Sequence, residues 1–337
     1  MTKKEHVMQA VRHQSSDTVP YCIHLTGEAY DLYGDQLLKD YFNRDVMDDY
    51  KAGLLSKMQA VNLSIGNYML PLDFPWWDWG YAHMPAAYGN ADEVPEEMPG
   101  IVREDTPENF EKFYRKAAYI SQKYQVFNTC LIFGSHWEKA YFTRGIENFL
   151  ADIAGAPEFA QALLDYIIRI NLEILPRLLK CNEVDGFLLG SDWGCQNDLI
   201  MSPQAWKQMI KAGEKAQYAL IQAAGKKVMV HSCGCIYRIL DELVELGVDI
   251  LNPVQPECMD LHRLKEQYGD ALTFWGGIST QRTLPFGTPE EVKKETEDTI
   301  KRMSQNGGYI TCSSQEIQVD VPYENLKMLI DTARSFT

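Results

Sequence analysis

The chain reads Lys227-Val228-Met229-Val230-His231 and then Ser232-Cys233-Gly234-Cys235, a short apolar run that ends abruptly in polar groups. Four similar apolar runs occur in the second half of the chain, at 186–190, 249–252, 271–275 and 308–312. Each of them is followed by an amphipathic stretch. Continuous apolar runs that alternate with helices are typical of a parallel sheet covered on both faces.

Helix signals stand between these runs. Thr288-Pro289-Glu290-Glu291 supplies an N-cap, a proline at the first helical position and a capping-box glutamate, and Ser202-Pro203 begins in the same way. The segment 240–246 has an apolar face and is followed by Gly247, where a C-cap glycine is expected. These signals predict helices between the strands.

Two earlier apolar runs, at 20–25 and 126–133, raise the expected number of strand–helix units to roughly eight. We therefore predict an α/β fold, a (β/α)8 TIM barrel, in preference to an open doubly wound sheet. No G-x-G-x-x-G motif follows the first strand. The region 67–100 breaks the pattern with prolines and tryptophans and is interpreted as an irregular insertion near the barrel mouth. Because no linker or repeat divides the chain, we expect one domain over residues 1–337.

The composition excludes several classes of protein. The 337 residues include 32 Lys and Arg against 47 Asp and Glu, a formal net charge of −15, which argues against nucleic acid or an anionic membrane as partner. No apolar run reaches the ~20 residues that span a bilayer, and the amino terminus has no apolar signal segment. We expect a cytoplasmic protein with its 8 cysteines reduced. The sequence leaves open whether the chain forms a homodimer.

Polar side chains follow the apolar runs, where a barrel carries its active site. They offer a small-molecule substrate many possible contacts. We predict substrate-binding roles for His24, His136, Trp193, Asn252, Gln255, Gln315 and, as part of an aromatic wall, Trp79. The alternative for the tryptophan is packing over the barrel end.

His231 and Cys233 lie on the same side of an extended segment, two residues apart, which suits two ligands of one zinc ion. Cys312 follows a later strand and would complete a three-ligand site with one open position, the arrangement of catalytic zinc. The alternative is that Cys233, Cys235 and Cys312 are small core residues and that His231 is a buried histidine with satisfied hydrogen bonds.

Two carboxylates are candidates for catalysis. Asp192, in Gly190-Ser191-Asp192-Trp193-Gly194, would bind a polar group of the substrate or act as a general base, unless it caps the following helix. Glu257 would act as an acid or as a further metal ligand, unless it is a solvated loop residue.

Several motifs follow one another over about residues 184–333: His231-Ser232-Cys233-Gly234 and the segments 247–256, 274–281 and 307–325. In this order they resemble the uroporphyrinogen decarboxylase superfamily, and more closely its methyltransferase-like branch. The resemblance implies a (β/α)8 barrel with its site at the carboxyl ends of the strands.

The superfamily contains two chemistries. Its decarboxylases carry an arginine-rich segment after the first strand, but residues 21–28 of this chain hold no arginine. Its methyltransferase branch implies a zinc held by H-x-C and a later cysteine, in enzymes that pass methyl groups between a substrate and a corrinoid protein. His231 and Cys233 match the first two ligands. Aligned on residues 322–325, the later cysteine falls at Gln315, so the third ligand stays open among Cys312, Glu257, Gln315 and Glu316, and metal binding itself stays open.

Three hypotheses result. The leading one is a zinc-dependent methyltransferase that acts on a small substrate, such as a methoxylated aromatic or a thiol, with a corrinoid protein as partner. The rival is a decarboxylase of a tetrapyrrole or another carboxylate-rich substrate, which requires that Arg103, Arg144 and Arg282 converge on the barrel mouth. The third is a non-catalytic barrel that binds a ligand or a corrinoid protein.

Overall fold

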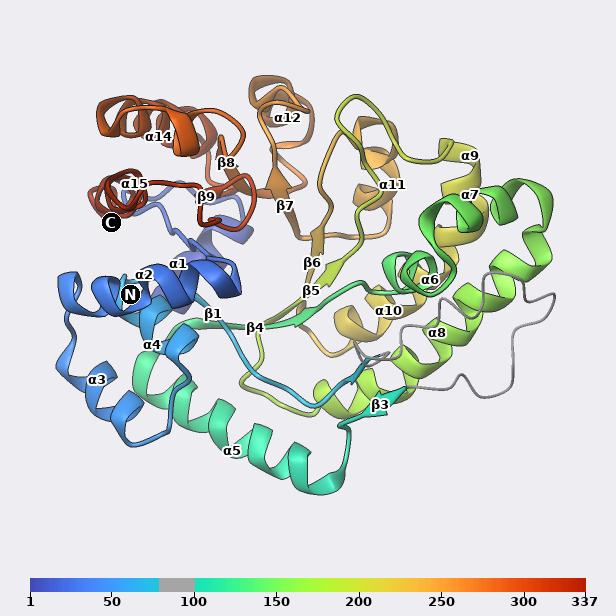
Figure 1. The fold of residues 1–337 in the computed structure, drawn as a ribbon, viewed down its shortest axis with the longest axis horizontal. Helices are drawn as coiled ribbons and strands as arrows, with labels where there is room; N and C mark the ends of the chain where they lie inside the picture. The colour runs from blue at the N-terminus through green and yellow to red at the C-terminus, as the bar shows by residue number, and fades with distance from the viewer. Residues whose placement is uncertain (79–100) are drawn as a thin grey trace.

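Seven parallel strands form the central sheet of the computed structural model, which describes residues 1–78 and 101–337. Neighbours in the sheet follow the order of the chain: β1 (Met69–Pro71), β4 (Phe127–Ile132), β5 (Gly186–Gly190), β6 (Lys227–His231), β7 (Ile250–Val254), β8 (Thr273–Ile278) and β9 (Tyr309–Ser313). Almost every residue of these strands is buried, as expected for a parallel sheet covered on both faces. Figure 1 shows the helices around this curled sheet.

The segment 20–25 closes the sheet between its two edges. On one side the Thr311 amide donates to the Pro20 carbonyl at 2.9 Å, and the Cys22 amide donates to the Thr311 carbonyl at 3.0 Å. On the other side the Tyr68 amide donates to the Tyr21 carbonyl at 2.9 Å. The segment therefore occupies the eighth position of the barrel, and the predicted (β/α)8 fold is confirmed.

This eighth position is not a regular strand, although the sequence predicted one there. It forms only isolated bridges, from Tyr21 to Thr311 and from Leu25 to Ile317. A side chain replaces the ladder on the β1 side: the Asn67 amide group accepts from the Ile23 N–H at 3.0 Å and donates to the Ile23 carbonyl at 2.8 Å.

The helices between the strands begin where the sequence predicted. The capping box of Thr288 and Glu291 is formed at the start of α14, Ser202 caps the short α9, and Gly247 follows α11 with a positive φ of 74°. The helices are α1 (Lys3–Val11), α2 (Gly27–Asp40), α3 (Arg44–Lys51), α4 (Lys57–Ser64), α5 (Pro107–Tyr124), α6 (Trp137–Arg144), α7 (Ile146–Gly155), α8 (Pro157–Leu178), α9 (Pro203–Ala205), a π-helix (Trp206–Ile210), α10 (Lys211–Ala223), a 3-10 helix (Tyr237–Ile239), α11 (Leu240–Glu245), α12 (Leu261–Tyr268), α13 (Thr283–Phe286), α14 (Pro289–Met303) and α15 (Tyr323–Arg334).

The region predicted as an insertion begins later than expected. Its first residues form β1, a barrel strand that the sequence prediction missed because it is three residues long and ends in Pro71. Beyond it, β2 (Trp77–Asp78) pairs antiparallel with β3 (Val102–Arg103). Trp79, predicted to bind substrate, lies outside the described residues.

Within the described residues, no helix is both long and apolar enough to cross a membrane. All 8 cysteines are free thiols, and Cys22, Cys130 and Cys181 are buried in the core. Packing is therefore their role in the fold.

Candidate functional site

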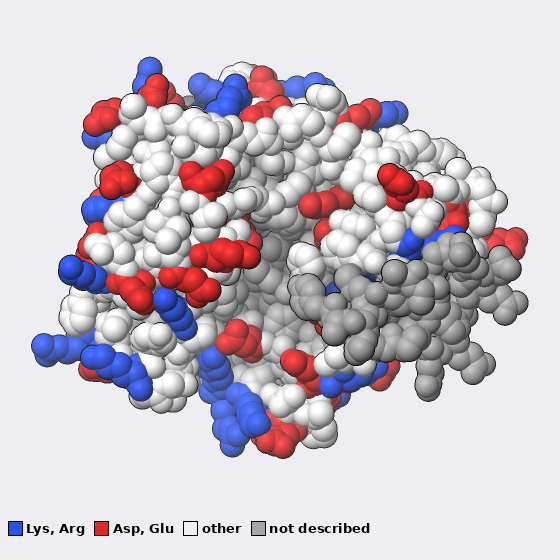
Figure 2. Space-filling model, in the orientation of Figure 1, with Lys and Arg blue, Asp and Glu red and all other residues white. Residues whose placement is uncertain are grey.

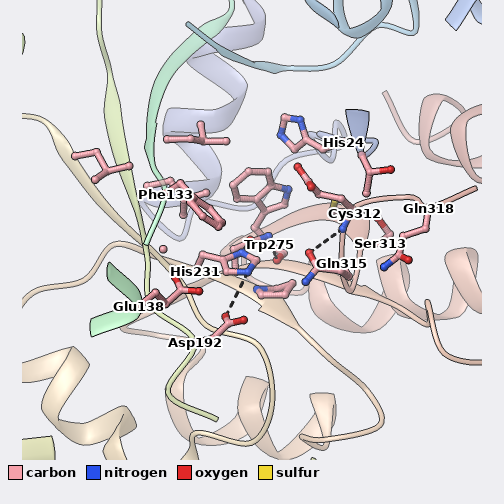
Figure 3. A pocket seen from close by; sticks show the side chains of 18 residues that line it. His24, Phe133, Glu138, Asp192, His231, Trp275, Cys312, Ser313, Gln315 and Gln318 are labelled. Atoms are coloured by element: carbon pink, nitrogen blue, oxygen red, sulfur yellow. Dashed lines mark hydrogen bonds and ion pairs between the residues drawn. The ribbon is translucent and has the colours of Figure 1, made fainter. Parts of the chain in front are cut away.

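A cavity of about 390 Å³ opens at the carboxyl ends of the barrel strands. Figure 3 shows His24, Glu138, Asp192, His231, Trp275 and Gln315 around it. They come from several of the barrel strands and from the segments that follow them, so the barrel places residues far apart in the sequence at one mouth. Figure 2 shows acidic side chains near a hollow in the middle of this face of the molecule.

Asp192, His231 and Cys233 form a compact cluster in this part of the molecule. One ligand atom from each lies within 4.8 Å of the other two. The His231 Nε2 is 3.6 Å from the Asp192 Oδ1 and 3.5 Å from the Cys233 Sγ, and Figure 3 shows the first pair facing each other. Nitrogen, sulfur and carboxylate oxygen are the ligand types that zinc takes in proteins.

Asn252, at the end of β7, fixes the orientation of the His231 ring. Its amide nitrogen donates to the Trp275 carbonyl at 3.0 Å, which turns its Oδ1 toward the His231 Nδ1, 2.7 Å away. Because that oxygen only accepts, the His231 Nδ1 carries the proton and the Nε2 presents its lone pair to the cluster. This is the supporting contact expected of a metal-binding histidine.

We predict that Asn252→Ala weakens zinc binding by about tenfold, the lower end of the losses typical for such supporting residues. The ring of His231 then loses the contact that selects its tautomer and direction. Competition with a chelator measures the affinity. An unchanged affinity in this variant would show that the hydrogen bond has no part in the site.

Two glycines bring the loops after β5 and β6 into contact. A Cβ on Gly194 would lie 2.6 Å from the Cys233 carbonyl oxygen, and one on Gly234 would lie 2.5 Å from the Gly194 carbonyl carbon. Only glycine permits this approach of two backbones. As a result, the Cys233 amide reaches the Asp192 Oδ1 at 2.8 Å. The spacing of Asp192 and Cys233 is therefore built into the backbone.

The Cys233 thiol is partly buried beside the Gln315 side chain, whose Nε2 donates to the sulfur at 2.9 Å. Burial raises the pKa of the thiol, and the neighbouring Asp192 carboxylate raises it further. A cation bound between these groups would favour the thiolate instead.

Glu138, in the first turn of α6, is a residue of the cavity that the sequence prediction missed. Burial raises its pKa to about 7, and Asp192 is the second cause. Its Oε1 accepts a hydrogen bond from the Tyr141 hydroxyl at 3.1 Å. The sequence did contain a signal for Glu138, namely its position after the predicted strand 126–133, but the prediction chose His136 from the same segment.

Comparison with known proteins assigns the chain to a family. The model of the family described as Uroporphyrinogen decarboxylase (URO-D) matches residues 105–336, more than half of the chain. The chain belongs to the uroporphyrinogen decarboxylase family. This membership confirms the superfamily that the motifs around His231 indicated.

Two proteins similar to this member of the family are informative. A uroporphyrinogen decarboxylase of Vesicomyosocius okutanii subsp. Calyptogena okutanii is 24% identical over 220 residues, a match that covers 60% of this chain and 58% of that protein. A solved methyltransferase from Methanosarcina mazei superposes with a TM-score of 0.68 at 16% identity, over 100% of this chain and 99% of the other. At that identity the second likeness supports the fold alone.

The structure places Cys312 and His24 in the lining of the same cavity, but not in the cluster of possible ligands. Cys312 is buried, its sulfur is 3.7 Å from the Ser313 hydroxyl, and burial raises its pKa to about 11. Asp192 takes the third place in the cluster that the sequence gave to Cys312. Strand order alone does not show which strand ends face each other across a barrel, so the sequence could not indicate that Asp192 lies closer to this pair than Cys312 does.

Several predicted site residues lie away from the cavity lining. Glu257 accepts a hydrogen bond from Ser279 and faces Arg282 at 3.6 Å. Gln255 accepts from the Gly234 amide and lines a separate small pocket. Trp193 and His136 are completely buried behind the cavity wall. Strand-end position is therefore not sufficient for lining the cavity.

The three arginines named for a decarboxylase do not converge on the cavity. Each is paired with a carboxylate elsewhere: Arg103 with Asp105, Arg144 with Asp152, and Arg282 with Glu257. The described lining of the cavity contains no lysine or arginine, and residues 79–100 contain neither type in their sequence. The cavity therefore offers a polycarboxylate substrate no side chain of permanent positive charge.

Proposed function

We propose that this member of the family is a zinc-dependent methyltransferase that moves a methyl group between a small substrate and a corrinoid protein. The observation that carries the proposal is the cluster of Asp192, His231 and Cys233, in which Asp192 and His231 line the cavity. The fold shared with a solved methyltransferase is consistent with it.

The residues present fit a zinc ion. His231 offers a lone pair at Nε2 because Asn252 holds its other nitrogen as a donor. Cys233 offers its sulfur. Asp192 offers a carboxylate oxygen, and its side chain is one third exposed. When bound, the ion would supply Lewis acidity toward a methoxy oxygen or a substrate thiol. This ligand set replaces Cys312 of the sequence prediction with Asp192.

The other cavity residues would hold the substrate and its protons. Glu138 titrates near neutral pH, so its carboxyl can hold a proton or release it beside the cluster. Gln315 directs its amide nitrogen at the Cys233 sulfur and would keep that sulfur in place. Leu131, Phe133 and Trp275 give the remainder of the wall an apolar character that suits a small methylated substrate.

Decarboxylation is the rival function, and the name of the curated relative favours it. It requires a cationic site for carboxylates, which the described lining of the cavity does not provide. The methyltransferase proposal therefore fits the residues better.

A paired assay tests the proposal. The zinc-loaded chain is incubated with cob(I)alamin and a panel of methoxylated aromatics and methyl thioethers, and formation of methylcobalamin is followed; a parallel sample receives uroporphyrinogen, and loss of carboxyl groups is followed. We expect methyl transfer that stops on chelation and resumes with zinc. Carboxyl loss without any methyl transfer would overturn the proposal in favour of the decarboxylase.

A further inference from the structure

A buried polar network lies directly behind the wall of the cavity, between the strand ends and helices α8 and α10. Its side chains are almost completely excluded from solvent and comprise Ser135, His136, Asn171, Ser191, Glu214 and Gln217. None of them lines the cavity. The network is therefore separate from the groups that would touch substrate.

The centre of the network is Glu214. Its Oε1 is 3.1 Å from the His136 Nδ1 and accepts from the Ser191 hydroxyl at 3.4 Å. Ser191 immediately precedes Asp192, and His136 stands two residues before Glu138. Glu214 thus contacts both loops that carry the carboxylates of the cavity. Gly213 leaves room for this arrangement, because a Cβ there would lie 2.9 Å from the His136 Nε2.

The loop before α6 receives further support from α8 and α10. Gln217 donates to the Ser135 hydroxyl at 3.2 Å, and Asn171 donates to the Ser135 carbonyl at 3.2 Å and to the Gln217 side-chain oxygen at 2.9 Å. A π-helix leads directly into α10, and such irregular turns are frequent near functional sites.

Stability alone does not account for this buried polar network. Both ring nitrogens of His136 and the Glu214 Oε2 are buried and make no hydrogen bond within the described part of the chain; the His136 Nδ1 lies 3.1 Å from the Glu214 Oε1 without hydrogen-bond geometry. Burying polar groups that are only partly satisfied costs free energy that an apolar filling of the same space would avoid. A cost of this kind is expected where the placement of a loop matters more than stability.

We propose that Glu214 and its partner His136 are positioning residues that set the Asp192 loop against Cys233 and the Glu138 turn against the cavity. Glu214 acts through Ser191, and His136 acts through the turn that it begins. The inference rests on the proposed function only for the role of Asp192 as a ligand.

Local hydrogen exchange of the metal-free chain provides the test. The amides to follow are those of segments 190–194 and 231–235, which include the Cys233 amide bonded to Asp192. In Glu214→Gln, which keeps the shape of the side chain but puts an NH2 donor in place of one carboxyl oxygen, we expect about tenfold faster exchange in both segments, because the contacts of Glu214 with Ser191 and His136 are disturbed. Asn325→Ala is the matched control: it removes a buried amide that donates to the Leu284 and Gly287 carbonyls, on the other side of the barrel.

The control separates positioning from general destabilisation. We expect Asn325→Ala to lower the unfolding midpoint without a change of exchange in these two segments. Exchange at the wild-type rate in Glu214→Gln, or equal acceleration in both variants, would overturn the inference. Ser191→Ala offers a milder variant should Glu214→Gln fail to fold. A wild-type chain that binds no zinc would overturn the proposed function, whereas the exchange result would still decide the role of Glu214.

Discussion

Cys233→Ala will lower zinc affinity by at least about a hundredfold, more than the loss expected for a residue that only supports a ligand. The variant removes the sulfur from a cluster whose three ligand atoms lie within 4.8 Å of one another. The remaining imidazole and carboxylate leave the ion without its softest ligand. Competition with a chromophoric chelator at fixed pH measures the change.

Two further cysteine variants make this result specific. Cys235→Ala removes a partly buried thiol two residues away that does not belong to the cluster, and it should bind zinc as the wild type does. Cys312→Ala tests the ligand that the sequence predicted, and it should also retain most of the affinity. If Cys312→Ala loses zinc while Asp192→Ala keeps it, then Asp192 is not the third ligand.

Acidification to about pH 5 will destabilise the wild type by about 2 kcal/mol more than His24→Gln, relative to about pH 7.5. Burial lowers the pKa of His24 to about 4 in the folded chain, below its ordinary value of 6.5. The unfolded chain therefore binds more protons between these two values. The contribution of neutral His24 to the free energy of unfolding is fully present above about pH 6.5 and is lost as the pH falls toward 4.

Urea unfolding at the two pH values measures this difference. His262→Gln serves as the control, because it makes the same replacement at a histidine that is largely exposed on α12. Equal acid destabilisation of the wild type and His24→Gln would show that His24 does not resist protonation in the folded chain.

The barrel was predictable from the sequence because its strands carry a strong local signal. The runs at 186–190 and 227–231 were predicted with the bounds that the structure shows. The signal failed at β1, which is too short to show a pattern, and at 20–25, where the Asn67 side chain replaces part of the ladder. Capping residues such as Thr288 also act locally, and the helix start at Thr288 was predicted correctly.

The candidate site was predictable only in part, because it depends on contacts between loops. The pair His231 and Cys233 lies on one strand end, so its spacing is visible in the sequence. The approach of Asp192 depends on backbone contact between Gly194 and Gly234, which no local pattern reveals. The burial of Glu138, which raises its pKa, likewise results from the packing of α6 over the barrel mouth.

Anomalous scattering at the zinc edge from crystals of the zinc-loaded chain tests the central claim most directly. We predict one strong peak per chain, at the ligand distances of about 2.0–2.3 Å from the His231 Nε2, the Cys233 Sγ and an Asp192 carboxylate oxygen. The same peak should vanish in Cys233→Ala. A peak bound elsewhere, or none at this cluster in the wild type, would contradict the account.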